Sequence, residues 1–222
     1  MTYRELINEV LIRLREDTID TNWSGAVNDS STVSAYHKVI AGLINDSKRH
    51  VESRHDWLNL RETVNISTVN GTVNYNLSSG QELKVVDSIN NTTATQLRQV
   101  SRSYLNKQKY PTAPTGEPLY YGFNGSDASN NLKIDLSPTP ITAETISFDI
   151  VKYQDELTSA ATVIKVPSKP VILGAWARAI AERGEDGGTQ SSLTAGEANE
   201  ALKQAIMVDS GNTEYETDWY IS

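Results

Sequence analysis

The chain has 222 residues, enough to bury one large hydrophobic core or two small ones. It contains no cysteine, which excludes disulfides, thiolate zinc sites and a thiol nucleophile. Its formal net charge of −8 argues against a sequence-independent grip on nucleic acid, which needs Lys and Arg to neutralise phosphates, although DNA would slide past an acidic lining.

The N-terminal region predicts two amphipathic helices. Thr2 and Glu5 have the spacing of a capping box, and apolar residues then recur every third or fourth position over 3–14. After a polar loop, Ser30 or Ser31 is the expected N-cap of a second helix, whose apolar positions again follow a helical period.

From Leu60 onward the apolar period changes to two, the pattern of half-buried strands. Asn70-Gly71 predicts a two-residue hairpin turn, and the segment around Asn124-Gly125 predicts a second hairpin. The other expected elements are a strand over 96–100, one or two helical turns over 101–107, and a strand over 145–153.

Two alanine-rich helices are predicted near the C-terminus, over 169–183 and 194–210. Thr189 is the alternative start of the second helix. Ser168 is the expected N-cap of the first helix, and the glycine-rich segment 184–188 is the turn between the two. Small residues on several faces of both helices would let neighbouring helices approach closely.

These elements predict an α+β protein. The N- and C-terminal helix pairs would form a four-helix bundle that carries an inserted antiparallel β-sandwich or barrel. The expected domains are a helical domain formed by 1–58 and 167–211, an inserted β domain over 59–166, and an extended C-terminal tail over 212–222.

No catalytic, cofactor-binding or metal-binding set is recognisable, so we expect no enzyme activity, no cofactor and no metal. His50 and His55 are five residues apart and do not share a helix face as an i, i+4 metal pair would. With Glu52 and Asp56 they would form at most a loose metal site at a solvated helix end. The N-terminus lacks a signal-peptide pattern and no apolar run is long enough to span a bilayer, so we expect a chain made in the cytoplasm.

The C-terminal tail alternates acids with large aromatics and has no helical stripe. Such a segment suits an extended peptide laid on the surface of a partner, with packing on its own domain as the alternative. The residues expected to make this contact are Tyr215, Glu216, Asp218, Trp219 and Tyr220.

The order of elements, with several short stretches, resembles the head-to-tail adaptor (connector) proteins of tailed bacteriophages. The likeness is greatest to the tail tubular protein A group of short-tailed phages. The stretches that carry it are Tyr3–Leu14, His55–Arg61 at the start of the β insertion, the strand end Ile150–Tyr153, Val166-Pro167, and Val171–Gly184.

The resemblance implies a virion structural protein in the neck or tail, assembled in the host cytoplasm without a membrane. It implies a homo-oligomeric ring of about twelve copies below the portal, which joins the portal protein to a tail nozzle or tail tube protein. Genomic DNA would pass through the ring without specific binding, and the C-terminal tail would bind the portal. The helix residues expected in ring packing are Ala175, Trp176, Ala179, Ala198, Ala201 and Ala205.

Two other functions stay open. One is a carbohydrate- or receptor-binding β module of a tail or baseplate protein. The other is a head-closure or tail-terminator protein, which the sequence barely separates from an adaptor. Exposed tyrosines would favour the first of these, and the candidates are Tyr104, Tyr110, Tyr120 and Tyr121.

Overall fold

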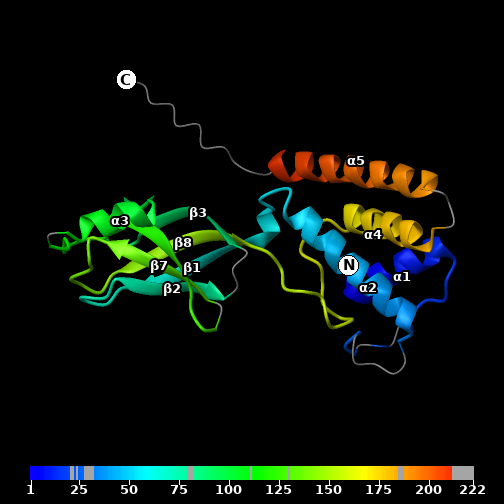
Figure 1. The fold of residues 1–222 in the computed structure, drawn as a ribbon, viewed down its shortest axis with the longest axis horizontal. Helices are drawn as coiled ribbons and strands as arrows, with labels where there is room; N and C mark the ends of the chain where they lie inside the picture. Colours follow the sequence, from blue (N-terminus) through cyan, green and yellow to red (C-terminus); the bar gives the residue numbers. More distant parts are fainter. Residues whose placement is uncertain are drawn as a thin grey trace, which may run out of the picture. The chain divides into compact units, whose positions relative to one another are not determined.

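The computed structural model describes residues 1–20, 23, 25–27, 33–79, 83–110, 112–129, 131–184 and 188–211. Within these residues the chain is an α+β protein with five α-helices and two four-stranded sheets, which confirms the predicted class (Figure 1). The chain divides into two compact units. A helical unit combines the two ends of the chain, up to Leu60 and from Tyr153 onward, and a β unit holds Arg61–Lys152.

The helical unit contains α1 (Tyr3–Leu14), α2 (Ala35–Glu52), α4 (Ser168–Arg183) and α5 (Thr189–Gly211), with a 3-10 turn at Leu58–Leu60. The central helix is α4, which packs against α1, α2 and α5. Its buried positions occupy most of its circumference, and many of them are alanines, which permits close packing. The longest helix, α5, lies on the outer side of α4 (Figure 1).

Two helix starts follow the sequence prediction. At α1 the Thr2 hydroxyl accepts a hydrogen bond from the Glu5 N–H at 3.3 Å, and the Glu5 carboxylate accepts one from the Thr2 N–H at 2.8 Å, so the capping box is confirmed. The last helix begins at Thr189, the earlier of the two starts considered. Thr194 is buried inside that helix and does not cap it.

Two other helix starts were predicted wrongly. The N-cap of α2 is Ser34, whose hydroxyl accepts from the amide three residues further on, whereas Ser30 and Ser31 lie outside the described residues. Ser168 is the first helical residue of α4 and Pro167 stands at the N-cap without a side-chain cap bond. Several neighbouring serines satisfy the sequence pattern, and the backbone path decides which hydroxyl reaches an amide.

The β unit contains two sheets whose inward faces contribute to one apolar core. The first has the order β1 (Arg61–Ser67), β8 (Thr145–Lys152), β3 (Leu83–Asn90) and β4 (Thr95–Gln96). The second has the order β2 (Asn74–Ser79), β7 (Asn131–Ser137), β6 (Tyr120–Ser126) and β5 (Arg98–Gln99). Neighbours are antiparallel except β5 and β6, which are parallel. The buried core residues are Ile66, Leu77, Leu97, Tyr121, Ile134, Leu136, Ile146, Phe148 and Ile150.

Two strand predictions are wrong in their pairing. Asn70-Gly71 does turn, with Gly71 at a φ of 76°, but the turn carries the chain from the first sheet to the second and closes no hairpin. The strand predicted over 96–100 divides into β4 and β5, one in each sheet, with Leu97 in the core between them. Turn chemistry is local, whereas the choice of a partner strand depends on residues far away in the sequence.

The second sheet carries the hairpin and the short helix that the sequence predicts. The hairpin around 124–125 forms between β6 and β7. The helix α3 (Arg102–Gln108) is capped by Ser101 and packs against β6 and β7. A Cβ added to Gly122 of β6 would lie 2.7 Å from Leu105 Cδ1, so this glycine permits the close approach of α3 to the strand.

Candidate functional site

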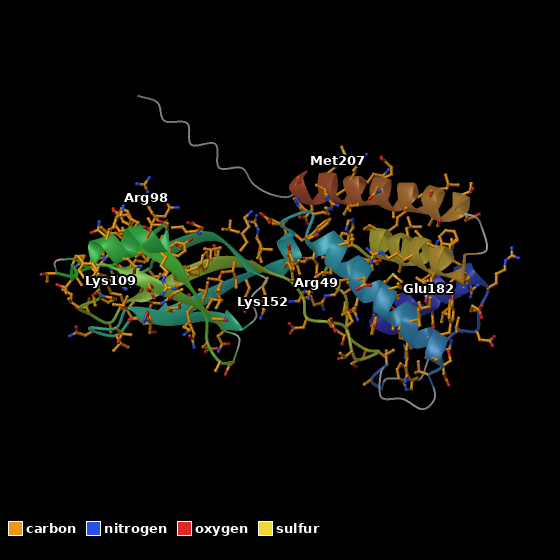
Figure 2. All side chains as sticks on the ribbon, in the orientation of Figure 1. Arg49, Arg98, Lys109, Lys152, Glu182 and Met207 are labelled. Carbon is orange, nitrogen blue, oxygen red and sulfur yellow. The ribbon has the colours of Figure 1, made fainter. Side chains whose placement is uncertain are left out.

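Three large apolar side chains of α5 are exposed to solvent. Leu193, Met207 and Val208 are 65%, 74% and 69% exposed. Figure 2 shows Met207 on the side of α5 that faces away from α4. Met207 and Val208 are neighbours, whereas Leu193 lies 14 residues earlier, so the exposed apolar surface of α5 is centred on its C-terminal end. The inner face of α5 is instead buried against α4, through Thr194, Ala201 and Leu202.

The residues predicted for ring packing lie in two environments. Ala175, Ala179 and Ala201 are 0%, 1% and 6% exposed, so they set the spacing of helices within one subunit and offer almost no surface to a neighbour. The other three are partly exposed, and their contact with a second copy stays a prediction; they are Trp176, Ala198 and Ala205.

A pocket of about 300 Å³ lies between α2, α4 and α5. Arg54 and Arg178 give it a cationic rim, and His50 lies beside them. Burial, together with the charges of the two arginines, lowers the pKa of His50. Ser47 lines the same pocket, is 2% exposed, and has no hydrogen-bond partner for its hydroxyl among the described residues. This rim favours an acidic side chain of a partner protein over a basic one.

A second pocket, of about 330 Å³, lies beside the C-terminal end of α5 and is more apolar. Trp57 and Val208 are among its lining residues. The end of α5 is fixed here through Asp209, whose carboxylate accepts from the Leu58 N–H at 3.2 Å and pairs with His55 Nε2 at 2.9 Å. The point from which the C-terminal tail leaves the helix is therefore held in place by the segment that follows α2.

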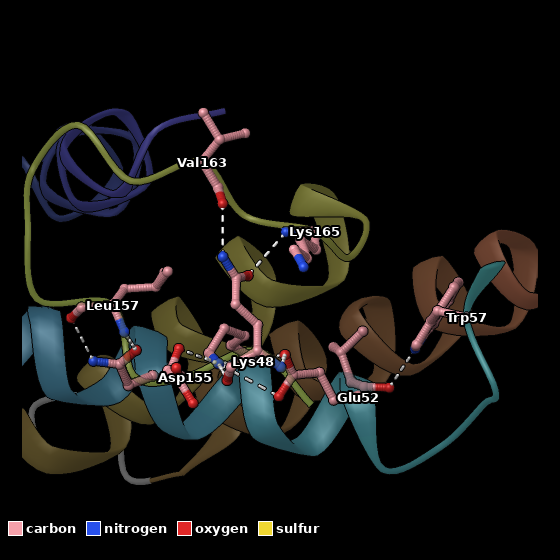
Figure 3. A network of polar contacts seen from close by, with 10 residues as sticks. Lys48, Glu52, Trp57, Asp155, Leu157, Val163 and Lys165 are labelled. Atoms are coloured by element: carbon pink, nitrogen blue, oxygen red, sulfur yellow. Dashed lines mark hydrogen bonds and ion pairs between the residues drawn. The ribbon is translucent and has the colours of Figure 1, made fainter. Parts of the chain in front are cut away.

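A buried ion pair anchors the segment that follows the β unit (Figure 3). Lys48 and Glu52 of α2 are each 1% exposed, and the lysine Nζ lies 3.3 Å from Glu52 Oε1. The same ammonium group donates to the carbonyls of Gln154 and Asp155, and the Gln154 N–H donates to Glu52 Oε1 at 3.1 Å. All three ammonium protons therefore have acceptors, as a buried charge requires.

The ionisation of this pair is shaped by its burial. Burial lowers the pKa of Lys48 and raises that of Glu52, while each partner's charge opposes these shifts. One turn earlier on α2, the Asn45 side chain bonds both the N–H and the C=O of Leu157, at 2.9 and 3.1 Å. Residues 154–157 belong to no helix or sheet, so their backbone groups need other hydrogen-bond partners. Side chains of α2 supply these partners and fix the segment on the helix.

The sequence alone did not reveal this anchor. Lys48 and Glu52 stand in the charged run at the end of the second helix, a pattern typical of solvated helix ends. The available signal was their i, i+4 spacing, which places both side chains on one face. The other partners of Lys48 are the backbone carbonyls of Gln154 and Asp155, and a sequence does not show which carbonyl a side chain will meet.

Metal binding has no visible centre in the part of the chain that the structure describes. There, no group of three or more His, Asp and Glu side chains is placed to hold a metal ion. The loose metal site considered from the sequence does not assemble, since Glu52 bonds Lys48 and His55 bonds Asp209. None of the described helices is long and apolar enough to cross a membrane. The predicted portal-binding residues lie outside the described residues; they are Tyr215, Glu216, Asp218, Trp219 and Tyr220.

The four tyrosines considered for a carbohydrate- or receptor-binding surface differ in exposure. Tyr121 is 4% exposed in the core, edge-on to Phe148 at 5.3 Å, so its prediction as a surface residue is wrong. It faces inward because side chains alternate along β6. Tyr104 and Tyr110 are 37% and 82% exposed. Tyr120 is partly buried and meets the Tyr104 ring edge-on at 5.5 Å.

Comparison with known proteins identifies one family. The family model described as SU10 adaptor protein matches residues 1–218, which is all of the chain except its last four residues. No curated protein sequence matches the chain. The family match confirms the resemblance to phage head-to-tail adaptors, a class of structural proteins of the virion. The chain therefore belongs to the SU10 adaptor protein family.

Proposed function

We propose that this protein forms a ring at the junction between the portal and the tail of a tailed phage and continues the channel through which DNA passes. The observation that carries the proposal is the adaptor-family match over residues 1–218. The outer face of α5 supports it, because a subunit that exposes Leu193, Met207 and Val208 to water is suited to bury them against another protein.

In this ring each subunit would contribute a four-helix bundle and a β-sandwich. The packing of α4 against three other helices supports the first, and the core shared by the two sheets supports the second. We assign 1–58 and 167–211 to the bundle, 59–166 to the inserted β domain and 212–222 to the tail.

The ring would close through heterologous contacts, in which one face of a subunit meets a different face of the next, with about twelve copies in the circle. Trp176, Ala198 and Ala205 are partly exposed and would lie at or near that contact. The buried alanines Ala175 and Ala179 would act indirectly, by keeping the helices behind the contact closely packed.

The C-terminal tail would bind the portal through Tyr215, Glu216, Asp218, Trp219 and Tyr220. Support comes from the alternation of acids and aromatics, which suits an extended peptide in the groove of a partner. The opposite side of the ring would meet a tail nozzle or tail tube protein. DNA would pass without recognition of its base sequence, and the subunits would assemble in the host cytoplasm before they become part of the virion neck.

Truncation after Gly211 tests the tail. The shortened protein should keep its fold, measured by circular dichroism and melting temperature, and should no longer co-sediment with purified portal. A full-length variant with Thr213→Ala and Thr217→Ala is the matched control, since it changes the tail outside the predicted contact set. Undiminished co-sedimentation of the truncated protein would show that the tail does not bind the portal.

The α5 face is tested by Met207→Glu with Val208→Glu, which adds charge to the exposed apolar surface. The free subunit should unfold at nearly the same denaturant concentration, within about 0.5 kcal/mol, because both side chains stand in water. Ring formation on portal, measured by analytical ultracentrifugation and electron microscopy, should be lost. Lys203→Glu, on the same helix and 73% exposed at its side chain, is the control. Absence of the chain from purified virions, by mass spectrometry, would overturn the function as a whole.

A carbohydrate- or receptor-binding function is the second candidate, favoured by the exposure of Tyr104 and Tyr110. A glycan array probed with the full chain separates it from the adaptor role, since an adaptor should bind no glycan. A head-closure or tail-terminator role differs only in its neighbours, so cross-linking in intact particles distinguishes it: an adaptor should cross-link to portal.

A further inference from the structure

Positive charge is concentrated in one part of the β unit. The whole chain has 20 Lys and Arg against 28 Asp and Glu, yet residues 88–116 contain four cations and no acid. These cations are Arg98, Arg102, Lys107 and Lys109, and they lie on β5 and on or next to α3. Asp87 and Glu117 bound this range and accept hydrogen bonds from Gln96 and Thr93, so the excess of positive charge is confined to β5 and the region of α3.

The backbone places these residues together on the outer side of the second sheet. Leu97 and Tyr121 face the core, so their chain neighbours Arg98 and Tyr120 face outward. Arg98 pairs with Tyr120 in the register of β5 and β6, and the Tyr120 ring touches that of Tyr104 on α3 at 5.5 Å. Figure 2 shows Arg98 projecting away from the ribbon.

We call this surface the α3 surface. It consists of side chains from α3, from the second residue after it and from the adjoining strand ends: Arg98, Arg102, Tyr104, Lys107, Tyr110 and Tyr120. The helix that presents it is held firmly. Ser101 caps the helix, and Leu105 is buried over Gly122 at a distance that admits no side chain on the glycine.

One of the four cations is engaged within the unit and three are not. Lys109 Nζ lies 3.7 Å from the carboxylate of Asp135, whose other oxygen accepts from Asn124 at 2.8 Å. Within the described ranges, Arg98, Arg102 and Lys107 are exposed and have no ion pair or side-chain hydrogen bond. Three charges are therefore available to an anionic partner.

The exposed residue types on α3 match those that contact phosphate. Apart from buried Leu105, the helix consists of Arg, Ser, Tyr, Asn, Lys and Gln, the side chains that supply most contacts to the DNA backbone. A protein partner would be expected to meet several apolar residues at the centre of its contact, whereas Tyr104, at 37%, is the single large apolar side chain that α3 itself exposes. The composition therefore favours a polyphosphate over an acidic protein.

We propose that the α3 surface binds the phosphate backbone of duplex DNA without reading its base sequence. Arg98, Arg102 and Lys107 would neutralise phosphates, and the hydroxyls of Tyr104 and Tyr110 would donate to phosphate oxygens. The acidic remainder of the chain repels DNA and keeps this contact weak, which suits a polymer that has to move past the surface. The inference goes beyond the junction role, because a free subunit should show the same binding.

The test measures binding of the free full-length chain to a fluorescent duplex by anisotropy at low salt. Binding through three phosphate contacts predicts a slope of log K against log salt of about −2.7, so raising salt from about 20 to about 100 mM should weaken binding about 80-fold. Two duplexes of unrelated sequence should bind alike. The variant Arg98→Glu, Arg102→Glu, Lys107→Glu should weaken binding at least about tenfold.

The matched control is Lys165→Glu, Lys169→Glu, Lys203→Glu, which makes the same change in net charge at exposed positions of the helical unit. It should keep most of the binding, and circular dichroism should show both triple variants folded. Three results would overturn the inference: no binding by the wild-type chain at low salt, equal losses in the two variants, or competition by polyglutamate as strong as by DNA at equal charge. The last would assign the surface to an acidic protein. None of these results bears on the co-sedimentation with portal, so DNA binding by the α3 surface and the adaptor function can be disproved independently.

Discussion

Glu52 in the helical unit and Asp135 in the β unit are both buried acids that pair with a lysine, but the two ion pairs differ in their exposure to water. In the helical unit, Glu52 and its partner Lys48 are both about 1% exposed and share their bonds with a backbone segment. In the β unit, Asp135 is 3% exposed but its partner Lys109 keeps 43% of its side chain in water. One ion pair is closed off from solvent and the other is half open.

The difference follows from the backbone that each pair serves. Residues 154–157 lie outside helices and sheets, so side chains of α2 have to supply the hydrogen bonds that regular structure would have provided. The strands beside Asp135 already bond one another. We therefore expect the Lys48–Glu52 pair to contribute much to the stability of its unit and the Lys109–Asp135 pair to contribute little. The following substitutions test that difference.

The largest effect is expected for Lys48→Met. It leaves Glu52 buried without its partner and should lower the free energy of unfolding by about 3–5 kcal/mol. Urea denaturation followed by tryptophan fluorescence is the measurement, because the four tryptophans, buried Trp57 among them, lie outside the β unit. Lys48→Met combined with Glu52→Leu should recover much of the loss, because an apolar pair removes the stranded charge. A loss below about 1 kcal/mol for the single variant would show that water reaches the site.

Gly122→Ala should come next. Its new Cβ would stand 2.7 Å from Leu105 Cδ1 and 2.9 Å from the carbonyl oxygen of Val100, and the second of these is backbone that yields little. We expect a cost of about 1–3 kcal/mol by urea denaturation, with displacement of α3 seen in hydrogen exchange. Gly196→Ala on α5 is the control, since its Cβ meets nothing within 4 Å, and it should be neutral or stabilising. Equal behaviour of the two alanines would contradict the packing of α3 described above.

Lys109→Met directly tests the half-open pair. Water can replace its ammonium group, and Asp135 keeps the hydrogen bond from Asn124, so we expect a loss of about 1 kcal/mol or less. The measurement is urea denaturation followed by far-UV circular dichroism, because the four tryptophans lie outside residues 61–152. If this variant lost as much free energy of unfolding as Lys48→Met, the two ion pairs would not differ in their contribution to stability.

The smallest effect concerns pH, and it should arise in the helical unit, which contains all three histidines. The pKa of His50 lies below its ordinary value of 6.5, so between these two values the unfolded chain binds more protons than the folded one. Stability from this group is complete above pH 6.5 and is lost as pH falls through the lowered pKa. His50→Asn should therefore reduce the fall in melting temperature between about pH 7 and pH 5. If the melting temperature of the variant fell by the same amount, His50 would not contribute to the loss of stability in acid.

Sequence reasoning recovered what depends on neighbouring residues. The apolar period of α1, the capping box at Thr2 and the hairpin around 124–125 are set within a few positions, and all three are present. The α+β class follows from the change of period near Leu60. Such features are readable because each local choice agrees with the fold.

What escaped the sequence depends on distant partners. β1 pairs with β8, although the Asn70-Gly71 turn suggested pairing with the next strand. Tyr121 and Tyr120 are adjacent and chemically identical, yet only the sheet decides which one is buried. Lys48 could not be distinguished from a solvated lysine, because its acceptors are carbonyls more than 100 residues away.

The pairing of β1 with β8 has one more consequence. The first residue of β1, Arg61, stands opposite Val151, one residue before the β unit ends. Both chain crossings into that unit are therefore neighbours, so the unit resembles a cassette attached by a single two-stranded stem. Insertion of a domain is tolerated where its two ends lie close together, so we expect changes within this unit to leave the helical scaffold as it is.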